Sequence, residues 1–282
     1  MSDRAMLGRT VPDTRIASAN NLGELHQTPG PVFYRTLGIR VDAVQIPGVL
    51  SCIDRWIAQR IRCHSISLLG MYGVTQAQHD ARLQQAFNSA DLAVPDGMPF
   101  VWLGRLHGLP LARRVYGPEL MLAACQYGLA KEYRHFFLGG APGTPEKLAE
   151  SLQSAYPGLR VAGVFSPPFR APSAAEDEQL IAAINAAGCD ILWVGLGSPK
   201  QDLWMHEHRE RLGAPVVIAV GAAFGMNSGM QKQAPVWLRE HGLEWLFRLG
   251  HEPRRLWRRY LINGAQFIVW IALEFAGLRK YN

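Results

Sequence analysis

Short apolar runs alternate along the chain with longer segments that have helical spacing. Patterns typical of strands occur at residues 40–46, 64–69, 92–94, 135–138, 159–165, 190–195 and 215–220. Segments with helical spacing occur at residues 50–61, 74–88, 98–107, 118–129, 174–187 and 201–212, and a further helix begins near Pro145. This alternation predicts βαβ units, and therefore an α/β fold with a mostly parallel sheet.

Three regions of the chain differ in pattern. Residues 1–33 are polar and show no sustained period, which is typical of a flexible leader. Residues 34–230 hold the strand patterns without a long linker between them, and we expect them to form one α/β domain. Residues 231–282 show helical spacing only, at 234–241, 243–249 and 253–278, and are predicted to form a helical appendage.

One predicted strand, residues 92–94, runs into Pro95, Asp96 and Gly97. A buried strand that stops at a turn places its last side chain at the edge of the sheet, where open α/β sheets bind ligands. Asp96 is therefore the first candidate for a catalytic residue. The alternative is a tight Pro-Asp-Gly turn in which the Asp side chain only bonds its own backbone.

Two other strand patterns end in glycine-rich turns before helices. One turn, GGAPG, begins with Gly139 and Gly140, and the other, GLGSPKQ, ends with Lys200 and Gln201. Glycine lets the backbone approach a phosphate, and a helix N-terminus adds N–H donors and positive potential. Neither turn fits the dinucleotide or P-loop motif, so NAD or ATP chemistry is not supported. Ordinary turn glycines are the alternative for each, but two such turns in one sheet favour a nucleotide-like ligand.

Polar side chains beside these turns suit the same ligand. Lys200 could bind a phosphate and Gln201 a sugar or base, at the start of one predicted helix. Arg114, which follows Arg113, precedes another helix start, and arginine is suited to bidentate phosphate contacts. Each of these residues alone is equally consistent with helix-end or surface decoration.

The overall charge favours anionic partners. The chain of 282 residues carries 29 Lys and Arg against 23 Asp and Glu, a formal net charge of +6. Its four cysteines form no CxxC pair and its histidines show no metal-ligand spacing, so neither a metal site nor a disulfide framework is predicted. Reduced cytosolic thiols are the simplest interpretation. The first residues lack the apolar core of a secretory signal, and none is predicted.

Positive charge and aromatic residues gather near the C-terminus. Residues 242–261 read GLEWLFRLGHEPRRLWRRYL, and residues 267–273 are apolar on nearly every side. Arg255 and Arg258 are three residues apart and are expected to share one helical face. This combination suits a helix that lies on a membrane surface, because the apolar run is too short to cross one. A helix buried at an oligomer interface is the alternative. Nucleic acid is disfavoured, because the aromatic residues continue into a purely aliphatic run.

Six motifs in order resemble the WecG/TagA/CpsF glycosyltransferases, glycosyltransferase family 26. They are ADLAVPDGMPFVW, RRVYGPELM, FFLGGAPG, WVGLGSPKQDLWM, VGAAFGMNSG and GLEWLFRL followed by HEPRRLWRRYL, and they cover about residues 38–261. The resemblance implies a Rossmann-like α/β sandwich with a C-terminal helical appendage that docks on the membrane and helps close the active site. It also implies an inverting enzyme that needs no metal or other cofactor and forms oligomers, notably trimers.

The substrates also follow from the resemblance. The donor is expected to be a UDP-sugar that carries N-acetylmannosamine, its uronic acid or a hexose. The acceptor is expected to be a saccharide linked to undecaprenyl diphosphate, a polyprenyl lipid, in bacterial surface polysaccharide synthesis. On this basis we expect a cytoplasmic protein bound peripherally to the inner face of the cell membrane. A non-catalytic nucleotide-sugar-binding subunit of a polysaccharide assembly complex is the alternative hypothesis.

Individual residues match functional positions of the family. Asp96 matches its general base, Arg114 and Gln201 match residues that line the pocket, and Arg248, Arg255 and Arg258 match appendage arginines that meet the diphosphate. Two positions depart from the family pattern. A pocket Asn is missing from the region Leu69, Gly70, Met71, and Gly225 stands where the family has an Asp. These departures leave the donor sugar open and motivate the non-catalytic alternative.

Overall fold

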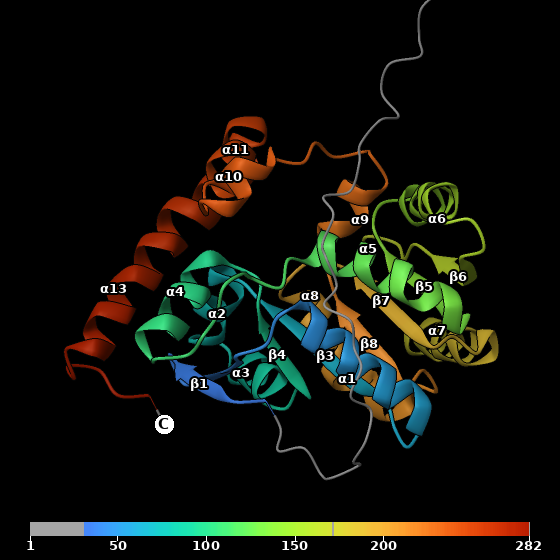
Figure 1. Ribbon diagram of the computed structural model, residues 1–282, viewed down its shortest axis with the longest axis horizontal. Coiled ribbons are helices and arrows are strands. Elements are labelled where there is room, and N and C mark those ends of the chain that lie inside the picture. Colours follow the sequence, from blue (N-terminus) through green and yellow to red (C-terminus); the bar gives the residue numbers. More distant parts are fainter. Residues whose placement is uncertain (1–30, 171, 282) are drawn as a thin grey trace, which may run out of the picture. The chain divides into compact units, whose positions relative to one another are not determined.

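The computed structural model describes residues 31–170 and 172–281. The predicted leader, residues 1–33, therefore lies almost wholly outside the described residues. Within them the predicted α/β fold is confirmed: strands and helices alternate up to the last strand, and only helices follow it (Figure 1).

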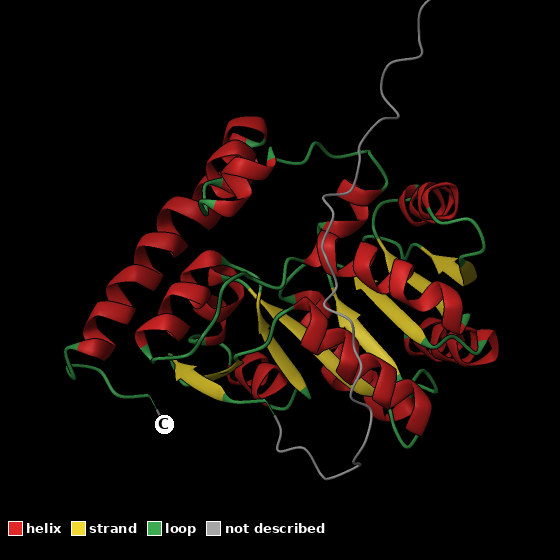
Figure 2. Cartoon of the chain, in the orientation of Figure 1, coloured by secondary structure: helices red, strands yellow, loops and turns green. Residues whose placement is uncertain are grey.

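Six strands form the central sheet (Figure 2). They are β3 (His64–Leu69), β4 (Leu92–Pro95), β5 (Arg134–Gly139), β6 (Arg160–Phe165), β7 (Ile191–Gly195) and β8 (Val216–Ala219). Their order is β4-β3-β8-β7-β5-β6, and every neighbouring pair is parallel. The carboxyl ends of all six strands therefore lie along one edge of the sheet.

Helices cover both faces of the sheet because successive side chains of a strand point to opposite faces. On β7, Ile191 and Trp193 belong to one hydrophobic cluster, whereas Leu192 and Val194 belong to another. The first cluster includes residues of α1 (Ile46–Gln59), α5 (Gly117–Gly128), α6 (Thr144–Ala155) and α9 (Ala223–Asn227). The second includes residues of α7 (Ala174–Ala187) and α8 (Lys200–His208).

A third hydrophobic cluster lies beside the β4 edge of the sheet, around Phe100. Its elements are the antiparallel hairpin β1 (Phe33–Thr36) and β2 (Ile39–Asp42), and the helices α2 (Met71–Ala77), α3 (Ala81–Asn88) and α4 (Met98–Leu106). The buried Asp42 carboxylate fixes the hairpin to the sheet, because it accepts the N–H of Ala93 at 2.8 Å.

Two local predictions are wrong in extent. The strand expected at residues 40–46 ends at Asp42, because Pro47 in the first turn of α1 favours a helix that begins at Ile46. The helix expected at residues 74–88 is two helices, α2 and α3. Asp80 separates them as an N-cap whose side chain accepts two backbone N–H groups of α3.

The helices predicted after residue 231 are present. They are α10 (Val236–Glu240), α11 (Glu244–His251), α12 (Pro253–Trp257) and α13 (Asn263–Phe275). A π-helical turn, Arg258–Ile262, joins α12 to α13 inside the segment that was expected to be one regular helix. A π turn contains an extra residue, so it changes which side chains share a face.

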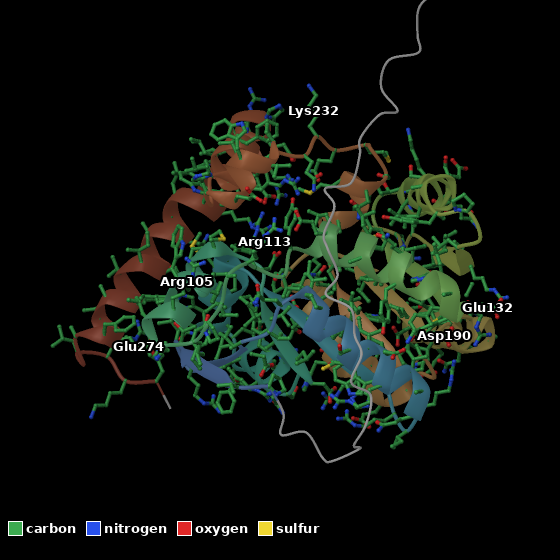
Figure 3. The ribbon with its side chains drawn as sticks, viewed as in Figure 1. Arg105, Arg113, Glu132, Asp190, Lys232 and Glu274 are labelled. Atoms are coloured by element: carbon green, nitrogen blue, oxygen red, sulfur yellow. The ribbon has the colours of Figure 1, made fainter. Side chains whose placement is uncertain are left out.

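One face of α13 packs against the α/β core. Phe267 is 2% exposed, and its ring meets that of Phe100 edge to face with centroids 5.4 Å apart. At the far end of the helix, Glu274 accepts the backbone N–H of Leu37 through both carboxylate oxygens, at 3.0 and 3.1 Å (Figure 3). The inner face of the C-terminal helix is thus part of the third cluster.

Removing the Phe267 side chain should destabilise the protein strongly. We expect Phe267→Ala to lower the free energy of unfolding by about 3–5 kcal/mol, because removal of the ring leaves a cavity against Phe100. The matched change Ile268→Ala, on the exposed face of the same helix, should cost less than about 0.5 kcal/mol. Urea unfolding of both variants measures the difference, and equal stabilities would contradict the packing of α13.

Candidate active site

A cavity of about 1960 Å³ lies at the carboxyl edge of the sheet. The residues that follow each of the six strands contribute to its lining: Gly70, Asp96, Gly140, Pro167, Leu196 and Val220. Open α/β sheets bind ligands at this edge. The cavity brings together side chains that lie far apart in the sequence.

Asp96 is at the end of β4 and lines the cavity. Its backbone N–H extends the parallel ladder by donating to Leu69 at 3.1 Å. Its carboxylate accepts the N–H of Gly117, at the start of α5, at 3.3 Å. This hydrogen bond comes from a residue 21 positions later rather than from the Pro-Asp-Gly turn itself.

The surroundings of Asp96 make its carboxyl group a weaker acid than usual. Burial is the largest influence and raises the pKa of Asp96 to about 6. The positive charge of Arg114 lowers this pKa, the negative charge of Glu244 raises it, and Arg248 lowers it further. A carboxylate with a pKa near 6 is a competent proton acceptor at neutral pH.

Arg114 is held on three sides. Its guanidinium donates to Glu244 at 2.5 Å and to the backbone carbonyl of Asp96 at 3.3 Å, and it lies over the ring of Tyr116, 4.1 Å from the centroid. The Tyr116 hydroxyl donates to the other Glu244 oxygen at 2.8 Å. Only 14% of the Arg114 side chain is exposed, and it lines the cavity beside Asp96.

Three arginines of the C-terminal helices gather at the same cavity: Arg248, Arg255 and Arg259. Burial and the positive charges of Arg248 and Arg255 lower the pKa of Arg259, whose guanidinium lies 4.5 Å from the ring centroid of Tyr72. The Nε atoms of Arg248 and Arg259 are buried without a hydrogen-bond partner among the described residues. Like charges drawn together in this way suit an anionic ligand.

Arg258 is the third of the arginines, after Arg248 and Arg255, that match appendage arginines of the family. It lies outside the cavity. It is exposed, stacks over Trp257 with its guanidinium 5.1 Å from the ring centroid, and is absent from the cavity lining. Arg259 lines the cavity with Arg255, which lies four residues before it. The match to the family singled out Arg258 and not Arg259, and the role of Arg258 in diphosphate binding stays a prediction.

The two glycine-rich turns follow β5 and β7, which are neighbouring strands of the sheet. Gly140 lines the cavity, whereas Gly139 lies against β7, where a Cβ would come within 2.5 Å of the Gly195 carbonyl carbon. Gly139 therefore permits close strand packing. Gln201 is buried and accepts the N–H of Gly197 at 3.1 Å, so its side chain shapes the second turn.

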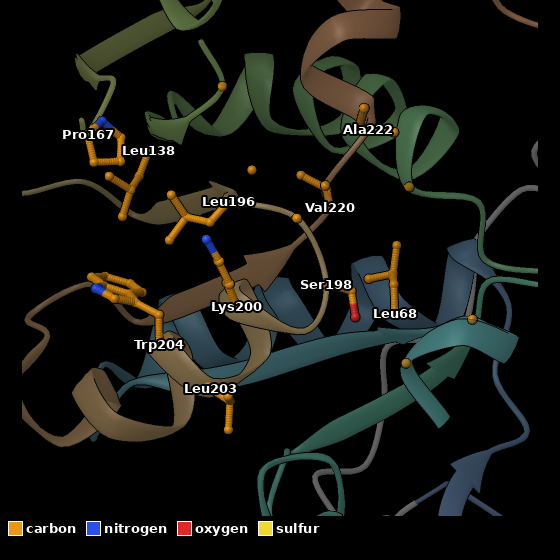
Figure 4. A pocket seen from close by; sticks show the side chains of 18 of the residues that line it. Leu68, Leu138, Pro167, Leu196, Ser198, Lys200, Leu203, Trp204, Val220 and Ala222 are labelled. Carbon is orange, nitrogen blue, oxygen red and sulfur yellow. The ribbon is translucent and has the colours of Figure 1, made fainter. Parts of the chain in front are cut away.

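One part of the cavity is apolar. Leu138, Pro167, Leu196 and Trp204 gather there, and the Lys200 side chain extends from the start of α8 toward Leu196 (Figure 4). The cavity thus combines a charged region around Asp96 with an apolar region beside residues 167–170. This combination suits a ligand with both a phosphate and a flat or apolar group.

Of the two regions that depart from the family pattern, Gly70 and Met71 line the cavity, whereas Gly225 is not part of its lining. Met71, in the region where the resemblance places a pocket Asn, begins α2 and lines the cavity. A Cβ on Gly225 would lie 3.2 Å from Cβ of Gln231, which lines the cavity and donates to Glu252 at 2.7 Å. Gln231 therefore places a different polar group beside the position of the missing Asp.

Metal ligands do not cluster in the described part of the chain. No group of three or more His, Cys, Asp or Glu side chains there is arranged to hold a metal ion. The cysteines of this part are Cys52, Cys63, Cys125 and Cys189, and none of them forms a disulfide.

A parallel α/β sheet with a carboxylate and arginines at its carboxyl edge is an architecture of enzymes that handle phosphorylated substrates. Residues 34–281 match the model of the glycosyl transferase WecG/TagA/CpsF family, and the chain belongs to this family. It is therefore a glycosyltransferase of the hexosyltransferase type. The resemblance seen in the six motifs is confirmed, and it extends further toward the C-terminus than the motifs do.

Three similar proteins share one name, N-acetylglucosaminyldiphosphoundecaprenol N-acetyl-beta-D-mannosaminyltransferase. The protein of Bacillus spizizenii is 32% identical over 187 residues, which are 66% of this chain and 70% of that protein. That of Bacillus subtilis is 30% identical over 175 residues, 62% of this chain and 66% of the relative. That of Staphylococcus aureus strain MW2 is 29% identical over 183 residues, which are 64% of this chain and 68% of that protein.

Neutralising Asp96 should stabilise the fold at neutral pH. The folded-state pKa of about 6 lies above the ordinary value of 3.8, so ionising Asp96 costs stability as the pH rises through 6. At pH 7.5 we expect Asp96→Asn to raise the melting temperature, by about 2–4 °C for each kcal/mol gained in the free energy of unfolding. Near pH 4 the substitution should have little effect, because Asp96 is then protonated in the folded protein.

Asp91, just before β4, supplies a control, because its replacement by Asn should change the melting temperature in the opposite direction. Burial opposes its ionisation, but the N–H of Ser65 and the side chains of Arg62 and His64 leave the pKa of Asp91 lowered overall. Asp91→Asn should therefore lower the melting temperature at pH 7.5. Differential scanning calorimetry of both variants checks the pair, and a lower melting temperature for Asp96→Asn would contradict the environment described for Asp96.

Proposed function

We propose that the protein is an inverting, metal-independent glycosyltransferase that moves N-acetylmannosamine from UDP to an undecaprenyl-diphosphate-linked N-acetylglucosamine in surface polysaccharide synthesis. The observation that carries this proposal is Asp96, a carboxylate with a raised pKa, beside Arg114 and Arg248 in one cavity. The names of the three relatives support the choice of N-acetylmannosamine over its uronic acid or another hexose. UDP as the carrier rests on the family resemblance.

In this proposal Asp96 is the general base. The acceptor hydroxyl attacks the anomeric carbon from the side opposite the leaving UDP, and Asp96 takes the hydroxyl proton as the new bond forms. The configuration at the anomeric carbon is therefore inverted in one displacement. The Gly117 N–H holds one carboxylate oxygen in place for this step.

The leaving diphosphate needs positive charge as the sugar–phosphate bond breaks. Arg114, Arg248, Arg255 and Arg259 supply it from fixed positions around the cavity. Cations held in place before the reaction stabilise developing negative charge without reorganisation. We assign the apolar region at Trp204 and Pro167 to the nucleoside part of the donor, because both residues line the same cavity as these arginines.

A non-catalytic nucleotide-sugar-binding subunit is the second candidate. Met71 and Gly225 favour it, because two polar groups of the family's pocket are missing. Asp96 and Arg114 argue against it, since a binding protein has no need of a carboxylate whose ionisation costs stability.

Replacing Asp96 should separate these two candidates. We expect Asp96→Asn to lower kcat by about 10²–10⁴-fold while UDP binding persists, because only proton transfer is lost. Wild-type kcat should rise with pH through about 6 and level off above it. UDP release is measured with a panel of UDP-sugars and a synthetic lipid-diphosphate N-acetylglucosamine, with and without EDTA.

Full activity of Asp96→Asn would remove Asp96 as the base. Absence of UDP release with every donor, in a wild-type protein that binds UDP, would favour the non-catalytic subunit. Loss of activity with EDTA would contradict the metal-independent mechanism.

We also propose that the outward face of α13 lies on the membrane. This face consists of apolar side chains that recur at helical spacing, such as Ile268 and Phe275 of α13 and Leu261 of the π turn before it, each more than half exposed. Exposed Arg254 and Arg258 precede it, and Arg279 and Lys280 follow it. An apolar stripe with basic ends suits an anionic lipid surface.

No helix in residues 31–170 and 172–281 has the length and apolar character needed to cross a bilayer. The proposed contact is therefore peripheral, on the inner membrane face that carries the acceptor. A second copy of the chain is the competing occupant of the α13 face, since the family resemblance also implies oligomers.

Removing basic residues beside α13 should weaken vesicle binding. Arg254→Gln with Arg258→Gln should reduce affinity for phosphatidylglycerol vesicles by about 2 kcal/mol, or roughly 30-fold, at about 1 kcal/mol for each charge. The control pair Arg82→Gln with Lys147→Gln, exposed on α3 and α6, should bind as the wild type does. Truncation after residue 250 is a poorer test because it would uncover Phe100.

Equal vesicle binding by both double variants would contradict the membrane proposal. The variant Ile268→Glu distinguishes the membrane from a second copy as the occupant of the α13 face. If sedimentation shows that this variant converts an oligomer to a monomer while vesicle binding is retained, the α13 face is assigned to a second copy.

A further inference from the structure

Glu244 is an acidic side chain buried where the C-terminal helices meet the α/β domain. It lies in the first turn of α11 and is 7% exposed. One oxygen accepts from Arg114 at 2.5 Å and the other from the Tyr116 hydroxyl at 2.8 Å. Arg114 and Tyr116 are two residues apart in the extended segment before α5, so both side chains project to the same side and reach one carboxylate.

The contact extends from Glu244 to the candidate base. Arg114 uses a second guanidinium nitrogen to donate to the Asp96 backbone carbonyl at 3.3 Å. It also lies over the ring of Tyr116, and the Arg239 guanidinium lies 5.6 Å from the centroid of the same ring. A guanidinium held by a carboxylate, a carbonyl and a ring has little freedom to rotate.

We propose that Glu244 is a positioning residue: it holds Arg114 against the end of β4, so that the proton-accepting site depends on the docked C-terminal helices. This inference rests on the proposed function, in which Asp96 takes the acceptor proton and Arg114 faces the diphosphate. Glu244 touches neither substrate in this account and acts through Arg114.

Electrostatics gives Glu244 a second effect. The charged groups that face Asp96 are Arg114 from the segment before α5, and Glu244 and Arg248 from α11. Both arginines lower the pKa of Asp96, and Glu244 raises it. Without the Glu244 charge, Asp96 would remain ionised to lower pH and would be a weaker base.

The neighbouring pair Arg113–Glu240 provides a matched control. It also joins the segment before α5 to the C-terminal helices, here at the end of α10, with Arg113 Nη2 donating to Glu240 at 2.9 Å (Figure 3 labels Arg113). Its side chains are 61% and 51% exposed, so its loss should leave the cavity intact. A general effect of loosening the helices would appear in Glu240→Gln as well.

The test measures kcat, the donor KM and their pH dependence for wild type, Glu244→Gln, Glu244→Asp and Glu240→Gln. We expect Glu244→Gln to lower kcat by about 10–100-fold, as is usual for residues that orient a catalytic group, with a smaller change in KM. The acid limb of its kcat profile should move to lower pH. Glu244→Asp, which keeps the charge, should recover part of the loss, and Glu240→Gln should stay within about twofold of wild type.

A ¹³C carboxyl NMR titration of Asp96, assigned with Asp96→Asn, supplies a readout that needs no substrate. We expect a lower midpoint in Glu244→Gln than in wild type and Glu240→Gln. An unchanged midpoint, or an unchanged kcat profile, would overturn the proposal. If the wild type transfers no sugar, the proposed function fails, and the titration alone still decides the role of Glu244.

Discussion

The charge balance around Asp96 is the constraint on which the site depends. A carboxylate at the end of a buried strand loses its hydration, and its pKa rises for that reason. Arginines close enough to hold a diphosphate would reverse this effect and weaken the base. Glu244 offsets the effect of Arg114 on the pKa of Asp96, and in our proposal this lets one cavity both bind the diphosphate and accept the proton.

The C-terminal helices contribute to the fold and to the site with different faces. Phe267 and Glu274 fix the inner face of α13 to the core, and Glu244 fixes α11 to the segment that carries Arg114. Arg248 and Arg259 reach the cavity from these helices. The outer face of α13 remains apolar, and in our proposal it meets the lipid that carries the acceptor.

Periodicity alone predicts most of the fold, because parallel strands buried on both faces are nearly continuous apolar runs. It also predicts that Asp96 ends a strand at the ligand-binding edge. Local pattern does not reveal Asp80, an N-cap inside a helical pattern, or the π turn after α12, and it does not show that Arg259 rather than Arg258 lines the cavity.

Contacts between distant residues are harder still to predict. Arg114 and Glu244 are 130 residues apart, and neither periodicity nor composition indicates that they meet. Gly139 was expected to approach a phosphate, but its neighbour in the structure is the backbone of β7. In each case the deciding interaction is a tertiary one, made only after the strands and helices pack.

The anomeric configuration of the product tests the central claim most directly. UDP-hexoses of this kind are α-linked, so a single displacement assisted by Asp96 must give a β-linked product, in line with the β-mannosaminyl names of the relatives. NMR of the lipid-linked disaccharide made by the wild-type enzyme determines the linkage. A β-linked product is the result we predict, and an α-linked product would contradict the role of Asp96 as general base.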